Sequence, residues 1–398
     1  MPESKLRSIV LLVLAEMVTM SLWFTSAAVL PDMIREAAIG PMRQALLSTS
    51  VQGGFVVGAL IVAISGIADR FDPRRVFALA ALAAALANAV LLIAPLGGDM
   101  AITVRFATGM LLAGVYPVGM KIAVGWGTAD RGLLIGLVVG ALTLGSSMPY
   151  LAAFLGGADW RITVVTVSLL ACLGAVLVLA TGLGPHHARS PRFEPGAIRL
   201  AWTNRTIRNA YLGYFGHMWE LYAMWAWVGV AAAASYGATM NDAAAESLGK
   251  LTAFIAIGLG GLVCVAAGLL ADRIGKAEVT IIAMAASGTA ALLTAITFGG
   301  PVWITFILIV IWGIAVIPDS AQFSALVADA CPAHLSGSLL TLQTALGFTL
   351  TIATVQLTPI LADYFGWPMV IAVMAFGPAI GILAMMPLRR AAPSPSTK

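Results

Sequence analysis

The chain has 398 residues, of which 60% are hydrophobic and only 10% are charged. A soluble domain carries about a quarter charged residues, so this composition excludes an ordinary soluble protein and predicts a chain surrounded by lipid. The net charge of +4 does not indicate nucleic-acid binding, because the basic residues lie in short loops, where they orient a membrane protein. We therefore expect lipid, and no nucleic acid, as a partner.

Apolar runs long enough to cross a membrane recur along the whole chain. A helix needs about 20 residues to span the hydrocarbon core. When a few internal charges are allowed, twelve spans result, at 8–30, 44–68, 76–98, 100–122, 132–158, 162–185, 208–235, 251–271, 279–318 (two spans, divided at 299–301), 330–362 and 364–388. Glycines four residues apart predict faces that let helices pack closely; they are Gly54 and Gly58 in the second span, and Gly132, Gly136 and Gly140 in the fifth.

The stretch 184–208 holds five arginines and lies midway along the chain. It predicts a cytoplasmic linker between two six-helix halves, at 1–183 and 209–390, followed by a disordered tail at 391–398. We therefore expect an all-α membrane protein with twelve transmembrane helices in two pseudo-symmetric halves.

The loop charges predict an orientation. If the N-terminus is cytoplasmic, sixteen Lys and Arg residues lie in inside segments, and only Arg35, Arg43, Arg161 and Lys250 lie outside. Positive charge collects on the cytoplasmic side of membrane proteins. We expect both termini in the cytoplasm and the chain in the cell (inner, cytoplasmic) membrane.

Few ionisable residues lie inside the spans. Lys121 is near a span end, and the others fall on the first, fourth, seventh and tenth spans: Glu16, Arg105, His217, Glu220 and Asp319. A charge in a bilayer costs several kcal/mol unless it is paired or hydrated, so such residues face a bundle interior or an aqueous cavity. Their recurrence at every third span predicts one polar centre, and with it a transporter.

Two loops at corresponding places in the halves share a pattern. They are Ser65-Gly66-Ile67-Ala68-Asp69-Arg70-Phe71-Asp72-Pro73-Arg74-Arg75 and Gly268-Leu269-Leu270-Ala271-Asp272-Arg273-Ile274-Gly275-Lys276. The pattern resembles the loop motif of the major facilitator superfamily (MFS), Gly-x-Leu-Ala-Asp-Arg-x-Gly-Arg-Lys. The first copy departs from it, since Ser65 replaces the leading glycine and Asp72-Pro73 interrupts the Gly-Arg position. Arg105-Phe106-Ala107-Thr108-Gly109 resembles that family's Arg-x-x-x-Gly motif on the fourth helix.

The resemblance implies a gating role for these loops. In that family the cluster latches the two halves on the cytoplasmic side in the outward-open state. The residues carried over are Asp69, Arg70, Arg74, Arg75, Gly268, Asp272, Arg273, Gly275 and Lys276. The alternative is an arginine cluster that only sets topology.

The resemblance also implies that helices one, four, seven and ten line the central cavity. Trp23 lies on the face of Glu16, two turns on. His217 and Glu220 are three residues apart and share a face, and a carboxylate beside an imidazole suits proton exchange. For Arg105 the alternatives are snorkelling to the outer interface or a structural pair with a carboxylate.

Two prolines predict breaks in these helices. Pro318 frees a backbone carbonyl and kinks the tenth helix beside Asp319, with Gln322 one turn on. Tyr116-Pro117 makes a similar, weaker break in the fourth helix. A kinked helix with an acid at the kink indicates a moving element that faces a ligand. A residue at the cytoplasmic end of the helix is the alternative for Asp319.

We expect a proton-coupled secondary transporter that moves a small solute by alternating access between its halves. Arg105 leaves open a small-anion permease of the cyanate or nitrate type, and a multidrug or solute exporter of the same fold is also open. A transporter-like solute receptor is the alternative of another class. We expect no enzyme, no cofactor and no metal site, because no phosphate-binding loop, catalytic constellation or metal-spaced cluster is present. We expect a monomer.

Overall fold

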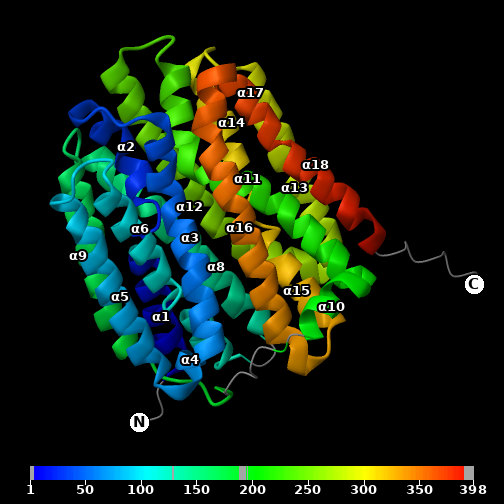
Figure 1. Cartoon of the computed structure of the whole chain (residues 1–398). Helices are drawn as coiled ribbons and strands as arrows, with labels where there is room; N and C mark the ends of the chain where they lie inside the picture. Colours follow the sequence, from blue (N-terminus) through cyan, green and yellow to red (C-terminus); the bar gives the residue numbers. More distant parts are fainter. Residues whose placement is uncertain (1–3, 128–129, 188–193, 195, 390–398) are drawn as a thin grey trace, which may run out of the picture.

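The computed structural model describes residues 4–127, 130–187, 194 and 196–389, without the side chains at 68, 69, 131, 333 and 334. The regular structure of this part of the chain is entirely helical, and the long helices pack lengthwise into one bundle (Figure 1). In chain order the helices are α1 (Lys5–Met20), α2 (Thr25–Glu36), α3 (Pro41–Ser65), α4 (Ile67–Arg70), α5 (Pro73–Ala89), η1 (Val90–Leu92), α6 (Asp99–Leu112), α7 (Tyr116–Val124), α8 (Arg131–Leu155), α9 (Trp160–Leu179), α10 (Gly196–Thr203), α11 (Arg205–Tyr236), α12 (Asp242–Ile274), α13 (Lys276–Ile296), α14 (Val302–Ala315), α15 (Ser320–Ala330), α16 (Ala333–Phe365), α17 (Trp367–Met374), α18 (Phe376–Met385) and η2 (Met386–Leu388).

Eleven stretches of the described chain are long and apolar enough to cross a membrane. The twelfth span is α11, which has 32 residues. Its tryptophans, tyrosines, histidine and glutamate lower its mean hydropathy below that of the other spans. The predicted fold of twelve transmembrane helices in two six-helix halves is confirmed, with α1–α9 in the first half and α11–η2 in the second.

Four spans consist of two consecutive helices joined by a short break. They are α1–α2, α6–α7, α14–α15 and α17–α18. The breaks before Tyr116 and Ser320 lie at the predicted prolines, Pro117 and Pro318. The break at 21–24 in the first span has no proline, and the contacts of Arg105 described below explain it.

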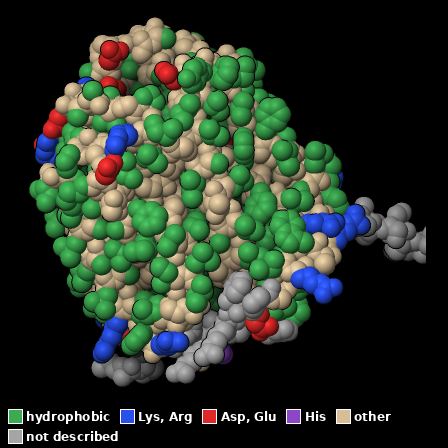
Figure 2. Space-filling model, in the orientation of Figure 1, with side chains coloured by type: hydrophobic (Ala, Val, Ile, Leu, Met, Phe, Trp, Pro, Cys, Tyr) green, Lys and Arg blue, Asp and Glu red, His purple; other side chains and the backbone are tan. Residues whose placement is uncertain are grey.

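The surface and the interior of the bundle differ as lipid requires. Large apolar side chains such as Leu79, Leu86 and Leu169 point outward and are exposed. Hydrophobic side chains are spread over the whole face in Figure 2, and charged ones lie mainly toward its ends. Since lipid tails are as apolar as leucine, close packing of small residues holds such helices together.

Glycines provide that packing at several of the predicted positions. A Cβ atom on Gly54 would lie 1.9 Å from the carbonyl oxygen of Phe106, so α3 and α6 touch backbone to backbone. A Cβ atom on Gly140 would lie 2.8 Å from the carbonyl oxygen of Gly261, which brings α8 and α12 of the two halves together. The prediction fails at Gly132, where a Cβ would meet no atom within 4 Å.

We call the end of the bundle that carries the 184–204 segment the linker end, and the other the opposite end. The predicted linker falls partly on residues 188–193 and 195, and the predicted tail on 391–398, all outside the described residues. The half boundaries at 183 and 209 therefore remain predictions. Within the segment, α10 packs its Ala197 and Ala201 against α11 and α16.

The first loop motif lies at the linker end and starts a helix. Asp72 caps α5 by accepting from the backbone N–H of Arg74 at 2.9 Å, and Pro73 takes the first helical position. The Arg74 guanidinium, which donates to Asp72 at 3.1 and 2.8 Å, holds the pKa of that carboxyl below its ordinary value. Arg70 and Arg75 are exposed, and the side chain of Asp69 lies outside the described residues.

The second copy also makes its contacts within one half. Asp272 and Arg273 are exposed, and Lys276 pairs with Asp329 of the same half. Gly275 has a φ of 112°, a conformation that favours glycine, between α12 and α13. A Cβ on Gly268 would meet no atom of the described residues within 4 Å.

Candidate functional site

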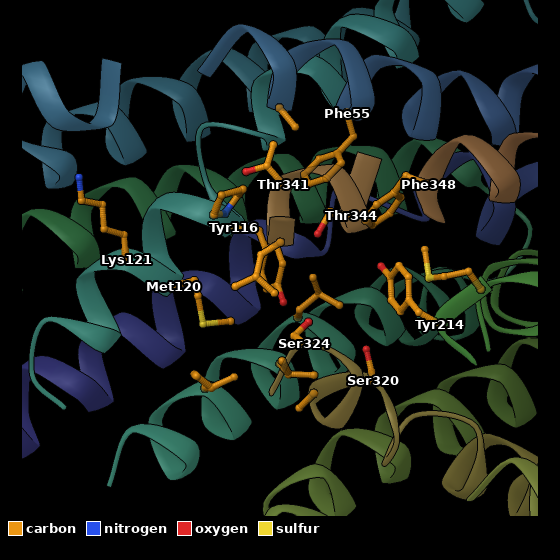
Figure 3. Close-up of a pocket in the computed structure, with 18 of the residues that line it drawn as sticks. Phe55, Tyr116, Met120, Lys121, Tyr214, Ser320, Ser324, Thr341, Thr344 and Phe348 are labelled. Carbon is orange, nitrogen blue, oxygen red and sulfur yellow. The ribbon is translucent and has the colours of Figure 1, made fainter. Parts of the chain in front are cut away.

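A cavity of about 400 Å³ lies between the two halves (Figure 3). Its described walls come from α3, α7 and α8 in the first half and from α11, α15 and α16 in the second. The lining runs from Phe55 and Phe348 in the middle of the bundle to Lys121 and Gly337 near the linker end. The cavity therefore occupies the linker-side half of the molecule.

Aromatic side chains from both halves close the cavity toward the opposite end. Trp23 of the first span lies 4.8 Å from Phe55 and 5.5 Å from Phe348, measured between ring centroids. Tyr222 of α11 lies 5.8 Å from Trp23 and 5.0 Å from Phe348. These rings form an apolar plug at mid-bundle, to which the predicted cavity residue Trp23 belongs without lining the cavity itself.

An ionic cluster joins the halves beyond this plug. Lys250 of α12 donates to Asp32 of α2 at 2.6 Å, and their side chains are only 9% and 1% exposed. Arg35 of α2 contacts both Asp32 and Glu246 of α12. We call Asp32, Arg35, Glu246 and Lys250 the opposite-end lock. Because it connects α2 to α12, the two halves cannot separate at this end while it is intact.

Glu16 lies behind the cavity wall. It is buried on α1, and its Oε2 faces Gly119 of α7 so closely that a Cβ there would come within 2.3 Å. Neither of its carboxylate oxygens has a hydrogen-bond partner among the described residues. Tyr116, on the same helix as Gly119, lines the cavity in front of it. An ionised carboxylate without a partner is costly to bury.

Arg105 is buried away from the cavity lining and does not snorkel. Its guanidinium donates to the carbonyl oxygens of Leu22 and Trp23 at 3.0 and 2.6 Å, and to Asn88 Oδ1 at 2.8 Å. The Arg105 hydrogen bonds that the structure describes include no carboxylate. Arg105 therefore supplies donors to the backbone carbonyls that the break at 21–24 leaves without helical partners.

His217 lies next to Asp319 across two helices. Its Nδ1 is 2.9 Å from Asp319 Oδ1, although the two atoms lack the alignment of a hydrogen bond. Both side chains are buried, and Asp319 sits at the break between α14 and α15. The next residue, Ser320, lines the cavity. The structure thus places an acid–imidazole pair at a helix break directly behind the cavity wall.

Glu220 has different partners from those its sequence position suggests. Its carboxylate accepts from Ser287 of α13 at 2.8 Å and from the indole of Trp312 of α14 at 2.7 Å. The expected pairing with His217 is therefore not the one that forms, since His217 faces Asp319. Gln322 is buried one turn beyond Asp319 and does not line the cavity.

Among the predicted cavity residues, then, Tyr116 alone belongs to the described lining, and the charged candidates stand behind it. Sequence reasoning missed the side chains that form the wall. Ser320 and Ser324 are four residues apart on α15, and Thr341 and Thr344 three apart on α16. That spacing puts each pair on one helix face, a signal that was available. Sequence reasoning also missed the opposite-end lock, whose partners Asp32 and Lys250 are 218 residues apart.

Comparisons with known sequences and structures identify proteins that are similar to this chain. Among curated proteins, none matches the sequence. A nucleoside transporter, NupG, shares the fold with a TM-score of 0.73 at 12% identity, covering 96% of this chain and 100% of its own. The xylose transporter XylE from E. coli, in a partially occluded inward-open conformation, gives 0.72 at 11% identity, covering 96% and 98%. A D-xylose–proton symporter gives 0.75 at 12% identity, covering 96% of each chain.

At these identities the structures show the fold alone. The sequence itself matches the family model of the Major Facilitator Superfamily over residues 12–355. That family consists of multi-pass membrane proteins that transport solutes and are not enzymes. This chain therefore belongs to the Major Facilitator Superfamily, and by that membership it is a secondary transporter.

Proposed function

We propose that the chain is a proton-coupled secondary transporter of a small solute, with its protonation site behind the cavity wall. The observation that carries the proposal is the buried pair of His217 and Asp319, at the break between α14 and α15 and next to the lining residue Ser320. Imidazole and carboxyl groups exchange protons near neutral pH when a protein environment adjusts them.

The position of this pair explains how proton transfer can drive movement. A buried carboxylate is stable only when it is paired or hydrogen-bonded, so its protonation changes which arrangement of helices is favoured. Asp319 occupies the N-cap position of α15 without a side-chain capping hydrogen bond. Helix α15 forms part of the wall, and a break between helices is a natural hinge. Glu16 is the corresponding carboxyl of the first half, against α7 and behind Tyr116.

We further infer that this conformation faces the cytoplasm. The cavity lies on the linker side, while the aromatic plug and the lock close the opposite end. The excess of basic residues at the linker end favours a cytoplasmic location for that end and for both termini. The similar fold of the xylose transporter in its partially occluded inward-open conformation supports the same interpretation. The cytoplasmic membrane is the location that this orientation implies.

The test compares gradient-driven uptake with exchange in proteoliposomes, using a labelled solute from a thermal-shift screen. Asp319→Asn and Glu220→Gln cannot release a proton. We expect at least one of them to abolish accumulation against a gradient while retaining exchange of unlabelled for labelled solute. Asp363→Asn, an exposed acid on α16, is the matched control and should accumulate solute normally.

The possible results separate the alternatives. If both variants still accumulate solute in proportion to the imposed pH gradient, neither residue couples transport, and Glu16 is the remaining candidate. Saturable binding without any flux in the wild type would indicate a receptor. A small-anion permease is less well supported by the geometry, because Arg105 binds backbone carbonyls and does not reach the cavity.

A further inference from the structure

We infer that the solute is uncharged and mainly apolar, with a ring or similar flat body and only a few hydrogen-bonding groups. This inference rests on the proposed transport function and names the class of its substrate. It follows from three properties of the cavity wall: its charge, its apolar surface and its free hydroxyl groups.

The charge of the wall argues against an ionic solute. Among the described lining residues there is no carboxylate, and Lys121 is the one charged side chain. Lys121 lies near the linker end, and it already has an interaction within the protein. The buried acids Glu16, Glu220 and Asp319 all stand behind the wall. A cation in the cavity would lose hydration without gaining a carboxylate partner, and an anion would meet only Lys121, which already interacts within the protein.

The surface of the wall favours an apolar body. Aromatic rings line it from both halves, including Phe55, Tyr116, Tyr222 and Phe348, together with aliphatic and methionine side chains. Rings of this kind stack on flat ligands and bury a large apolar area. The volume of about 400 Å³ lies within the range of roughly 300–1,000 Å³ that is usual for ligand pockets, so a solute of one or two rings fits.

The hydroxyls of the wall are available to a ligand. On α16, Thr349 and Thr351 donate to carbonyl oxygens one turn back, at 2.8 and 2.7 Å. Thr341 and Thr344 of the same helix make no such bond within the described structure, although the geometry of the helix permits it. Ser320 and Ser324 on α15 likewise have none, and Figure 3 shows these side chains around the same space.

The same wall is poorly suited to sugars and nucleosides, the solutes named for the three similar structures. Such molecules carry many donors and acceptors, and each one buried without a partner costs about 1–3 kcal/mol. Amide and carboxylate side chains can form two hydrogen bonds each with neighbouring hydroxyls of such a solute. The described lining contains no Asn, Gln, Asp, Glu or His. The uncharged polar side-chain groups of the wall are single hydroxyls, including those of Tyr116, Tyr214 and Tyr222, and the indole N–H of Trp225. Each of them can satisfy one isolated polar group, so they suit a solute whose polar groups are separated by apolar surface.

The test measures binding to the purified protein at pH 7 with three probes that share one ring system. Naphthaleneethanol is neutral, naphthaleneacetate is an anion and naphthaleneethylamine is a cation; D-xylose and uridine complete the set. By isothermal titration we expect the neutral probe to bind at least tenfold more tightly than either ion, with no binding of xylose or uridine. Tighter binding of an ion, of xylose or of uridine would overturn the inference, and so would a failure of all three ring probes to bind at millimolar concentration.

A pair of variants locates the site. Thr344→Val removes a free hydroxyl from the wall, and Thr349→Val removes one that is bonded to its own helix. We expect Thr344→Val to weaken naphthaleneethanol binding between about twofold and tenfold, the contribution of one neutral hydrogen bond. Thr349→Val should leave it unchanged. Equal effects of the two variants would contradict the assignment of the site.

Binding is measured without flux, so the two proposals can fail separately. Asp319→Asn should still bind the neutral probe even if it no longer couples transport. If the neutral probe binds as expected but no proton-dependent uptake occurs, the proposed function is wrong and the ligand class stands. If uptake is proton-dependent for an ionic or sugar solute, the ligand class is wrong and the function stands.

Discussion

Removing Lys250 should open the end of the molecule that the lock closes. In the present conformation its ammonium lies 2.6 Å from the Asp32 carboxylate, and both side chains are almost fully buried. Lys250→Met keeps the length of the side chain and deletes the charge. Asp32 is then left in a dry interface with Arg35 as its remaining partner.

The magnitude follows from burial. Deleting one partner of a buried ion pair costs about 3–5 kcal/mol, because the other charge stays desolvated. Arg35 compensates part of this cost, so we take about 3 kcal/mol, the lower end of that range. When the opposite end opens, water reaches Asp32 and the cost disappears. In Lys250→Met the equilibrium should therefore shift by roughly 100-fold toward the state in which the opposite end is open, at about 1.4 kcal/mol per factor of ten.

A more exposed pair of the same lock provides the graded control. The side chains of Arg35 and Glu246 are 46% and 26% exposed. Pairs of this kind contribute about 0–1 kcal/mol, so Glu246→Gln should shift the equilibrium by less than about fivefold. The double variant Asp32→Asn with Lys250→Met leaves no unpaired acid at the pair. It should shift the equilibrium less than Lys250→Met alone, which a general loss of stability would not produce.

Electron–electron distance measurements on spin labels read the shift. Labels at positions 40 and 363 sit on exposed residues at the opposite end, one in each half, in a chain whose three cysteines are replaced. We expect Lys250→Met to increase the population of the longer distance. An unchanged distance distribution in Lys250→Met, or a larger shift in Glu246→Gln, would refute the reasoning.

Three further predictions concern packing, orientation and the linker-end motif. Gly54→Ala should lower the Tm in detergent, because its Cβ would lie 1.9 Å from a backbone oxygen. Gly132→Ala is the control and should leave the Tm unchanged, since its Cβ would meet nothing within 4 Å; equal Tm values for the two variants would contradict the backbone contact. Single cysteines at Glu194 and Asp242 should label from opposite sides of the membrane with an impermeant reagent on intact cells, and outside labelling at 194 would reverse the proposed orientation. Asp272→Asn should slow transport and leave solute affinity unchanged, because Asp272 is exposed in this conformation and is expected to act when the linker end closes. Weaker solute binding with a normal transport rate would argue against a latch at this loop.

The sequence alone determined the number of spans and the helices that carry the polar centre. Both depend on local quantities: the length of an apolar run against the thickness of the hydrocarbon core, and the cost of a charge within it. The breaks near Pro117 and Pro318 were also predictable, because proline removes a backbone donor wherever it stands. The family resemblance, resting on the duplicated loop and on Arg105, was confirmed by the match over residues 12–355.

The partners of the buried charges depended on the tertiary structure. His217 and Glu220 share a helix face, yet one meets Asp319 and the other meets Ser287 and Trp312, because each side chain reaches a different neighbouring helix. Arg105 was expected near the cavity or paired with an acid. It donates instead to the backbone carbonyls of the helix break at 21–24, which contains no proline that would have predicted it.

The cavity wall and the lock were decided by the same level of structure. Serine and threonine on a membrane helix can bond their own backbone or face a ligand, and the choice made by Thr344 and Thr349 depends on what packs against each turn. Asp32 and Lys250 are each an ordinary charge near the end of a span. They become a buried pair only because α2 and α12 from different halves meet there, and a contact between residues 218 positions apart leaves no periodic trace in the chain.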